Sequence, residues 1–496
     1  MLKILDTLRK EKALHSDLRR KSELGQFMTP SSVAEFMASL FQPARSGTSE
    51  LLDAGAGLGA LSTAFLLQFN KWNLEKAKLR ITAFEVDDFL RLELENLFAC
   101  LAFDNSFDSS VRPFDFIEDA SHQILFERPD LFDYVILNPP YKKISSASQH
   151  RSRLRSVGIE TVNLYSAFVA LAIKLLKEGG QLVAILPRSF CNGPYYKSFR
   201  EQIFRETAVR HIHLFDSRNK AFKEDGVLQE NVVIALEKGG VQGDVIISTS
   251  TDDTFSDLQR FQFPFSRIVY EGDTENFLHI PTSTEPDFHE GSLTFNQRLS
   301  DLFIEVSTGP VVDFRVREHT SDLLMTDSVP LLYPGHFEGS KLVWPRENWK
   351  KPNAIAVNEE TKRWLYPTGF YTVVRRFSSK EEKRRIRAHV FEPHRIPEAH
   401  FIGFENHFNV FHFRKEGIEE DIAFGIAAFL NSTSVDKYFR RMNGHTQVNA
   451  TDLRQLRYPS LDILSEIGKL SRGTDVTDQK SVDVILRTVL DKCIEM

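Results

Sequence analysis

Hydrophobic residues in the first half of the chain form short runs that alternate with stretches of helical periodicity. The run Phe132–Leu137 has the length and the Ile, Val and Tyr content of a buried strand, and the prolines after it forbid its continuation. Other strand-like runs lie at residues 81–87, 181–186, 211–215 and 231–237, and residues 50–59 are typical of a strand that enters a glycine-rich turn. A helix is expected over Leu164–Lys177, after a polar loop at residues 142–156. The alternation from about residue 50 to residue 240 predicts a doubly wound α/β sheet.

The composition changes past residue 240, and this change sets the expected domain boundaries. Residues 241–300 are polar and rich in Ser, Thr and Asp, as in a linker that keeps remnants of strands. Beyond residue 300 prolines and aromatic residues become dense, and helical periodicity returns only at residues 418–441. We therefore predict an N-terminal helix (1–24), a doubly wound domain (25–245), a linker (246–300) and a mixed α+β domain (301–496).

Composition and charge limit the classes of protein to consider. Hydrophobic residues make up 42% and charged residues 26% of the 496 residues, as in ordinary globular proteins, and no apolar stretch has the length of a membrane span. The first twenty residues are charged, unlike a signal peptide, and the three cysteines have no metal-binding spacing, which suits a reducing cytoplasm. With a formal net charge of −6, a nucleic-acid partner would need a locally basic surface.

A glycine-rich turn between a strand and a helix indicates a nucleoside-binding site. Asp53 ends the strand, and Gly55, Gly57 and Gly59 let the backbone turn sharply and approach a ligand closely. The pattern D-x-G-x-G-x-G departs from the G-x-G-x-x-G fingerprint of dinucleotide-binding folds. The next strand ends at Glu85, an acid suited to a ribose diol. Glu85 taken alone would more often be a helix cap, so the two features count together.

Two further segments carry candidate cofactor-binding residues, each with a second interpretation. Asp115 could accept a hydrogen bond from an adenine amino group while Phe116 packs on the adenine face, but a surface turn explains these residues equally well. The sequence GQFMTP at residues 25–30 precedes a helix that Thr29 or Ser31 can cap. The N-terminus of such a helix also attracts anions. A simple capped helix is the alternative there.

The sequence NPPY brings an amide, a fixed carbonyl and an aromatic ring to the ligand-binding edge of the predicted sheet. The Asn138 side-chain oxygen and the Pro139 carbonyl could accept both hydrogens of an exocyclic amine on a nucleobase and turn its lone pair toward an electrophilic methyl group. Pro140 keeps the turn rigid, and Tyr141 could stack on the base. Four-residue matches are common by chance, and a strand stopped by proline is the alternative.

The second half of the chain contains a locally basic segment. Between Lys341 and Arg387 there are 13 Lys and Arg residues against 5 Asp and Glu, a local charge of +8. Charge runs usually form solvated faces, but interleaved aromatic residues on an acidic protein favour DNA contact. Arg375 and Arg376 are neighbours in a strand-like run and should face opposite ways, so at most one of them should reach DNA.

The order of these motifs resembles one family. GQFMTP, DAGAGLG, FEVD and NPPY follow one another as in the γ class of amino-group DNA methyltransferases, of which the TaqI adenine methyltransferase is the best-known fold relative. This resemblance covers residues 25 to about 240. TVVRRFSSKEE (372–382) and NGHTQVNATDLR (443–454) extend it to the PstI/BsuBI-type modification enzymes. The resemblance implies a Rossmann-like, S-adenosylmethionine-dependent methyltransferase domain followed by a DNA target-recognition domain.

The resemblance also assigns roles to single residues. Thr29 matches the position that holds the methionine carboxylate, and Asp115 with Phe116 matches the adenine-binding pair. The implied cofactor-binding residues are Phe27, Thr29, Asp53, Gly55, Gly57, Glu85, Asp115 and Phe116. The implied catalytic residues are Asn138, Pro139, Pro140, Tyr141 and Phe222. Phe222 matches the second stacking aromatic loosely, because the loop after it is longer and lacks the following proline, and Phe215 is its rival.

Our main hypothesis is a DNA adenine methyltransferase, the modification component of a type II restriction-modification system. We expect S-adenosylmethionine as cofactor, double-stranded DNA with a flipped adenine as substrate, a monomer, and a separate restriction endonuclease, since no span is left for a fused nuclease; the resemblance suggests the target CTGCAG. A methylase of RNA or of protein glutamine is one alternative, and a DNA-binding protein with a vestigial cofactor site is another. Residues 230–232 spell a tripeptide seen in cytosine-ring methylases, but no Pro-Cys supplies the thiolate that those enzymes need.

Overall fold

The computed structural model describes residues 28–43, 47–75, 77–102, 107–129, 131–215, 230–282, 295–378, 382–443 and 446–495. The chain forms two compact units, divided after Thr284. The N-terminal helix predicted over residues 1–24 lies outside the described residues, as do Phe27 and Phe222. Within the described part of the chain, no helix is long and apolar enough to cross a membrane.

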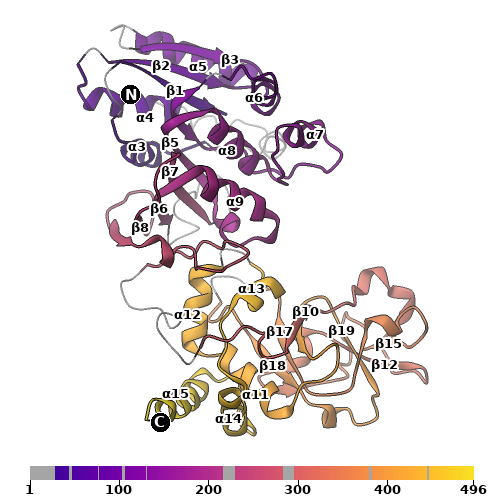
Figure 1. The fold of residues 1–496 in the computed structure, drawn as a ribbon. Helices are drawn as coiled ribbons and strands as arrows, with labels where there is room; N and C mark the ends of the chain where they lie inside the picture. Colours follow the sequence, from indigo (N-terminus) through magenta and orange to yellow (C-terminus); the bar gives the residue numbers. More distant parts are fainter. Residues whose placement is uncertain are drawn as a thin grey trace. The chain divides into compact units, whose positions relative to one another are not determined.

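The first unit is built on a nine-stranded sheet (Figure 1). Its strands are β1 (Thr48–Ala54), β2 (Lys78–Phe84), β3 (Phe107–Arg112), β4 (Phe132–Leu137), β5 (Leu176–Pro187), β6 (Thr207–Phe215), β7 (Asn231–Lys238), β8 (Val245–Ser250) and β9 (Gln259–Phe263). The order is β3-β2-β1-β4-β5-β7-β6-β8-β9. The strands from β3 to β5 pair in parallel, and β7 runs antiparallel to both of its neighbours.

The strand order reverses between β1 and β4. After β1 the chain adds β2 and β3 on one side and then crosses back to place β4 on the other side of β1. Leu51 pairs with Tyr134 and Leu52 with Val135, so the carboxyl ends of β1 and β4 lie side by side. In open α/β sheets this reversal point is where ligands bind. The doubly wound sheet predicted from the alternation is confirmed.

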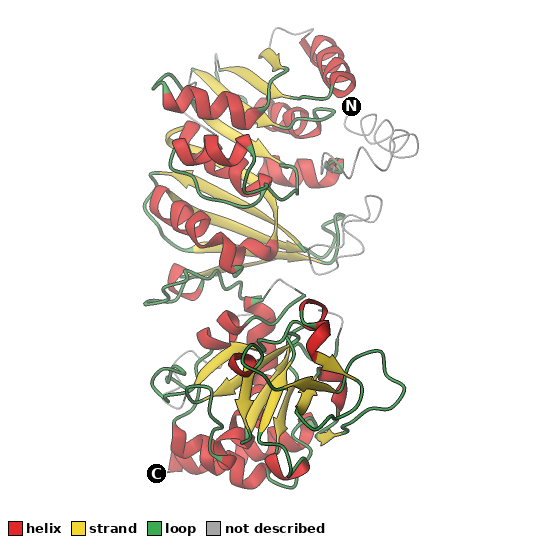
Figure 2. Ribbon diagram, turned by 90° about the vertical axis from the view of Figure 1, so that its right-hand side faces the viewer, coloured by secondary structure: helices red, strands yellow, loops and turns green. Residues whose placement is uncertain are grey.

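Helices cover both faces of the sheet (Figure 2). On one face lie α3 (Ser31–Ser39), α4 (Ala60–Lys71) and α5 (Asp88–Leu101); on the other lie α6 (Phe116–Leu125), α8 (Leu164–Leu175) and α9 (Lys197–Glu206). Along β4, Tyr134 and Ile136 pack into the core under α3, α4 and α5, while Val135 and Leu137 pack into the core under α6, α8 and α9. Because successive strand side chains point to opposite faces, a strand covered on both sides is apolar throughout.

The linker predicted over residues 246–300 is wrong at its start, because β8 and β9 complete the sheet. Part of the Ser and Thr content that suggested a linker belongs to buried positions of β8. The Ser248 hydroxyl lies 2.6 Å from His211 Nε2, and the Ser250 hydroxyl lies 3.2 Å from His213 Nε2. A buried hydroxyl with a partner can stand where an apolar residue would otherwise be expected.

The polar stretch before α8 differs from the predicted loop, since it contains the helix α7 (Gln149–Ser156). Ser148 caps α7 by accepting from Arg151 N, and Leu154 is its buried residue. One buried side chain among exposed polar ones gives too weak a period to be recognised from sequence. The next helix ends at Leu175, slightly before the predicted end at Lys177.

The second unit combines small sheets with helices (Figure 1). The strands are β10 (Glu305–Thr308), β11 (Thr320–Ser321), β12 (Ser328–Leu332), β13 (Phe337–Glu338), β14 (Lys341–Leu342), β15 (Ala354–Ala356), β16 (Leu365–Pro367), β17 (Tyr371–Arg375), β18 (Ala388–Phe391), β19 (Phe401–Phe404) and β20 (Phe408–His412). One sheet has the order β10-β20-β17-β18, another β11-β15-β12-β19-β16, and β13 pairs with β14. The mixed α+β architecture predicted here is confirmed.

The helices of the second unit are α11 (Glu420–Leu430), α12 (Thr433–Met442), α13 (Ala450–Gln455), α14 (Leu461–Ser471) and α15 (Gln479–Glu495). The single helix predicted over residues 418–441 is divided, because Ser432 caps α12 by accepting from Val435 N. α11 packs closely on α14. At the crossing an added Cβ on Gly425 or Gly468 would collide with backbone of the facing helix, so glycine permits this approach.

Candidate active site

The glycine turn after β1 wraps around the end of β2. Gly55 N and Ala56 N both donate to the Phe84 carbonyl oxygen, at 3.0 and 2.9 Å. Gly57 has a φ of 55°, which favours glycine, and a Cβ on Gly57 would meet nothing within 4 Å. A ligand can therefore approach this backbone closely.

Glu85 follows β2, and its carboxylate holds the same turn. One oxygen accepts from Gly57 N at 2.9 Å, and the other accepts from Asp87 N at 2.8 Å. The residue is 2% exposed, and burial raises its pKa although these hydrogen bonds oppose the rise. A carboxylate can accept about four hydrogen bonds, so holding the turn is compatible with binding a ribose.

Asp53 is the last residue but one of β1 and is fully buried. Its Oδ2 accepts from the Ser62 hydroxyl at 2.6 Å and from Ser62 N at 3.2 Å, while Oδ1 has no hydrogen-bond partner among the described residues. Burial raises the pKa of Asp53 to about 7, Ser62 opposes the rise, and the charge of Glu85 adds to it. A buried oxygen without a partner costs free energy. Together with the open space beside Gly57, this oxygen fits a ligand that brings a hydrogen-bond donor.

The Asn138 amide is held from two sides. Its Nδ2 donates to Thr29 Oγ1 at 2.9 Å, and its Oδ1 accepts from the Tyr141 hydroxyl at 3.3 Å. That hydroxyl also lies 3.3 Å from the Ile185 carbonyl oxygen, and burial raises the pKa of Tyr141, which keeps the phenol protonated. The amide is thus oriented before any substrate arrives. Because Thr29 accepts here, its own hydrogen remains available to donate.

An aromatic cluster supports Tyr141 from behind. The ring of Tyr141 meets Tyr165 edge to face at 6.1 Å, and Tyr165 lies 5.6 Å from Tyr196. The Tyr196 hydroxyl accepts from Asn163 Nδ2 at 2.5 Å. Sequence reasoning did not single out these tyrosines, because aromatic residues in and near a helix are most simply explained as core.

Asp115 is the N-cap of α6, where its Oδ1 accepts from Glu118 N at 3.0 Å. Its Oδ2 lies 3.2 Å from His150 Nε2 of α7. Burial would raise the pKa of Asp115, but the hydrogen bonds from His150 and Glu118 N outweigh burial and lower it. Phe116 is buried in the core, with its ring 5.2 Å from Phe84.

Of the two candidates for a second stacking aromatic, Phe215 and Phe222, only Phe215 lies among the described residues. Phe222 lies outside the described residues. Phe215 ends β6 and is buried, with its ring 4.6 Å from His213 and 5.9 Å from Phe255. A ring packed into the core offers no free face to a base, which counts against Phe215.

Other polar residues at this edge of the sheet gave no sequence signal. Ser62 lies in a helical segment and His150 in the stretch predicted as a polar loop, and only the fold brings them to Asp53 and Asp115. Glu230 was noted for its tripeptide, but its buried carboxylate accepts from Arg188 Nη1 at 3.0 Å and joins the ends of β5 and β7. This ion pair explains Glu230 without a catalytic role.

Part of the basic surplus in the second unit is used within that unit. Arg384 and Arg385 are buried. Arg375 Nη2 lies 3.2 Å from Glu382 Oε1, and Arg376 Nη1 donates to the Asn406 carbonyl oxygen at 3.3 Å. The local charge of +8 therefore overstates the charge open to a partner.

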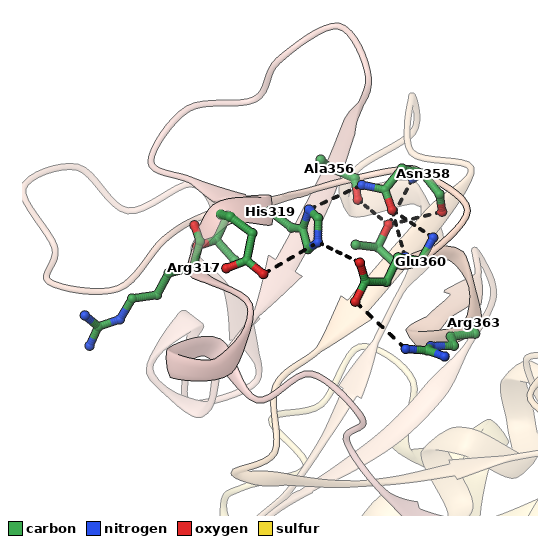
Figure 3. A network of polar contacts seen from close by, with 9 residues as sticks. Arg317, His319, Ala356, Asn358, Glu360 and Arg363 are labelled. Carbon is green, nitrogen blue, oxygen red and sulfur yellow. Dashed lines mark hydrogen bonds and ion pairs between the residues drawn. The ribbon is translucent and has the colours of Figure 1, made fainter.

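The polar network in Figure 3 uses further charges of the same segment. Glu360 lies between His319, at 3.4 Å, and Arg363, at 4.0 Å, and Asn358 Nδ2 is 3.3 Å from His319 Nδ1. The side chain of Arg317 extends away from this network. The network ties the segment before β11 to the loop after β15.

Known proteins resemble this chain over nearly its whole length. It is 51% identical to the type II methyltransferase M.BsuBI of Bacillus subtilis, over 95% of this chain and 94% of the relative. It is 44% identical to the type II methyltransferase M.PstI of Providencia stuartii, over 94% and 92% of the two chains. Residues 63–222 match the Eco57I restriction-modification methylase family. Among solved structures, a putative class I S-adenosylmethionine-dependent methyltransferase from Listeria monocytogenes is 16% identical and covers 51% of this chain and 73% of its own, with a TM-score of 0.40.

Proposed function

The chain belongs to the type II methyltransferases, and from this premise we propose that it methylates the N6 amino group of adenine within a short site on double-stranded DNA. S-adenosylmethionine is the proposed methyl donor. The enzyme would be the modification component of a restriction-modification system and would protect host DNA in the cytoplasm from a separate endonuclease.

The observation that carries the amino-group assignment is the fixed amide of Asn138. Thr29 and Tyr141 hold it at the end of β4, next to the glycine turn after β1. The adenine amine is a poor nucleophile, because its lone pair is shared with the ring. Two acceptors, Asn138 Oδ1 and the Pro139 carbonyl oxygen, would hold both of its hydrogens and turn the lone pair out of the ring plane. Preorganised groups of this kind need no reorganisation during the reaction.

The residues of this chain would contribute position rather than proton transfer. When bound, S-adenosylmethionine supplies an electrophilic methyl group on a sulfonium. The adenine nitrogen held by Asn138 and Pro139 would take up that methyl group, with the carbon–sulfur bond as the bond broken, and would give up one proton to water. Neither an amide nor a peptide carbonyl is a strong base, so the rate would come from alignment and exclusion of water.

The cofactor would lie along the glycine turn between β1 and α4, beside the end of β2. Glu85 is proposed to bind the ribose hydroxyls, and Thr29 the methionine carboxylate. Asp53 Oδ1, buried without a described partner, would accept a hydrogen bond from the cofactor side. Asp115 would accept a hydrogen bond from the amino group of the cofactor's adenine, which its half-buried position allows. The buried ring of Phe116 could offer that adenine only its edge.

The target adenine must leave the duplex before it can reach Asn138. Tyr141 would stack on the flipped base, with Phe222 as the proposed second aromatic. We propose that the second unit recognises the DNA site and that the enzyme acts as a monomer. We propose CTGCAG as the target, which the resemblance to the PstI/BsuBI-type modification enzymes suggests.

The test is to incubate the protein with radiolabelled S-adenosylmethionine and duplexes that contain CTGCAG or a scrambled site. Digestion to nucleosides and chromatography should yield N6-methyldeoxyadenosine from the first duplex alone. Label on cytosine, on RNA or on a protein glutamine would overturn the adenine assignment. Label on adenine in a different sequence would overturn the target only.

A further inference from the structure

The loop after NPPY returns to the cofactor side of the site. It leaves Tyr141, forms α7 and brings His150 back to Asp115 at the start of α6, where the two side chains lie 3.2 Å apart. The Asp115 and His150 side chains are 36% and 32% exposed, so a ligand can still reach the pair. One stretch of chain therefore borders both the proposed base pocket and the proposed adenine subsite of the cofactor.

The position of His150 is set by the fold of the loop. Ile144 N donates to the Val162 carbonyl oxygen, and Leu164 N donates to the Lys142 carbonyl oxygen, both at 2.8 Å. Leu154 of α7 is fully buried against the core of α6 and α8. Because the loop is closed at its base and anchored in its middle, His150 is presented to Asp115 rather than reaching it by chance.

The carboxylate of Asp115 is oriented by this contact and has room for another. Glu118 N and His150 Nε2 each donate one hydrogen bond to it, and a carboxylate has about four acceptor positions. The hydrogen bond to Asp115 raises the pKa of His150, burial opposes the rise, and the charges of Glu118 and Arg153 act in opposite directions on it. The protonated imidazole is thus favoured beside an ionised carboxylate.

We propose that His150 is a positioning residue for the cofactor. It would orient the Asp115 carboxylate so that its remaining acceptor positions meet the amino group of the cofactor's adenine. It would also couple this cofactor subsite to the loop after Tyr141, which begins beside the proposed target base. The inference rests on the proposed function. Through this contact, bound cofactor should strengthen DNA binding, and because coupling between two sites is reciprocal, DNA should strengthen cofactor binding by the same factor. His150 should carry part of that effect.

A purely structural role would be to fasten α7 to α6, and matched variants separate the two roles. His150→Ala removes the donor, while His150→Gln keeps an N–H donor. Arg155→Ala removes a different ion pair of the same helix, at 2.8 Å from Glu160 Oε2, and leaves Asp115 untouched. Binding of S-adenosylmethionine is measured by calorimetry on each full-length variant without DNA. DNA affinity is then measured with and without S-adenosylhomocysteine.

The expected result is a loss of cofactor affinity of about tenfold in His150→Ala, as for a hydrogen bond to a charged group. The cofactor affinity of His150→Gln should stay within about threefold of that of the unchanged protein, and the affinity of Arg155→Ala should equal that of the unchanged protein. The gain in DNA affinity that S-adenosylhomocysteine brings should shrink in His150→Ala alone. Unchanged affinity in His150→Ala would overturn the inference, and so would equal losses in His150→Ala and either other variant. Failure of the unchanged protein to bind S-adenosylmethionine would count against the proposed function instead.

Discussion

Both units bury charged side chains, but for different purposes. In the first unit, Asp53 and Glu85 lie where the strand order reverses, burial raises the pKa of both, and Asp53 Oδ1 has no described partner. In the second unit, Arg385 is 1% exposed and donates to the Ser378 hydroxyl and to Asn443 Oδ1, at 3.2 and 3.1 Å. Burial of charge therefore does not identify a site by itself. We propose that a buried polar atom without a partner at the ligand-binding edge, such as Asp53 Oδ1, marks a site, whereas a bonded group such as Arg385 holds the fold together.

The largest effect should come from Asn138→Ala, which removes the amide from the reacting amine. We expect methyl transfer to fall about 100- to 1000-fold, as for loss of one preorganised polar contact in other active sites. Cofactor affinity should change much less than turnover, because Asn138 is proposed to contact the base and reaches the proposed cofactor site only through its hydrogen bond to Thr29. Turnover measured at saturating cofactor, with calorimetry on the same variant, checks both parts. Normal turnover would exclude the adenine-amine mechanism.

The comparison of the two units predicts that Arg385→Ala, in contrast to Asn138→Ala, mainly lowers the free energy of unfolding. The variant removes a buried donor from the Ser378 hydroxyl and from Asn443 Oδ1, and it removes the guanidinium 5.7 Å from the centre of the Phe439 ring. Unfolding should therefore become easier by about 3 kcal/mol. Arg387→Ala is the matched control, because Arg387 is 45% exposed and pairs with Glu382 at the surface. Denaturant titrations of the two variants give the difference. Equal stabilities would mean that the buried guanidinium does not hold the second unit together.

Asp53 adds a dependence on pH that Arg385 cannot show. Its pKa rises from 3.8 to about 7 on folding, so between these values the native state keeps a proton that the unfolded chain has lost. This contribution to stability is present below pH 4 and is lost as the pH rises through 7. Compared with Asp53→Asn, the unchanged protein should lose about 2–3 kcal/mol between pH 5 and pH 7. A constant difference between the two across that range would mean that Asp53 is ionised throughout.

How far the sequence predicted these groups depends on whether their neighbours are local. The sequence predicts β4 because both of its faces are buried. It singles out Asp53 and Gly57 because a strand, a glycine-rich turn and a helix follow one another within a few residues, and Glu85 because it directly follows the next strand. Ser62, in the next helix, gave no such signal, although it carries both hydrogen bonds to Asp53.

The contacts that complete the candidate site join distant parts of the chain. Thr29 meets Asn138 across 109 positions, and this partner could not be read from a capped-helix pattern. The second unit gave few elements for a related reason. Its strands are as short as 2 residues and its sheets mix distant segments, so no period of alternation develops along the sequence.

Glu85→Ala should show an intermediate effect on binding. Loss of hydrogen bonds from the ribose to a charged acceptor is worth roughly 1.5–3 kcal/mol, or about 10- to 100-fold in affinity for S-adenosylmethionine. Because Glu85 also holds Gly57 and Asp87, some stability should be lost as well. Calorimetry together with thermal unfolding separates the two losses. Unchanged affinity would place the cofactor elsewhere.

The smallest effects should come from the two neighbouring arginines at the end of β17, Arg375 and Arg376, which differ in how the second unit holds them. Arg375 is tied to Glu382, which also pairs with Arg387, whereas Arg376 is held by a neutral carbonyl at 3.3 Å. A guanidinium without an acidic partner loses less when it turns to a phosphate. We therefore expect Arg376→Ala to weaken DNA binding a few-fold and to make the slope of log affinity against log salt less steep by about 0.9, the value of one phosphate contact.

Arg375→Ala is the matched control and should leave that slope unchanged while it lowers the unfolding temperature slightly. DNA affinity measured at several salt concentrations for the unchanged protein and both variants decides between them. If Arg375→Ala reduced the slope and Arg376→Ala did not, the acidic partner would be a switchable contact rather than a structural one. The ion pair between Arg375 and Glu382 would then not serve to hold the second unit together, and the contrast drawn above between bonded and unsatisfied charges would not apply to the surface proposed to bind DNA.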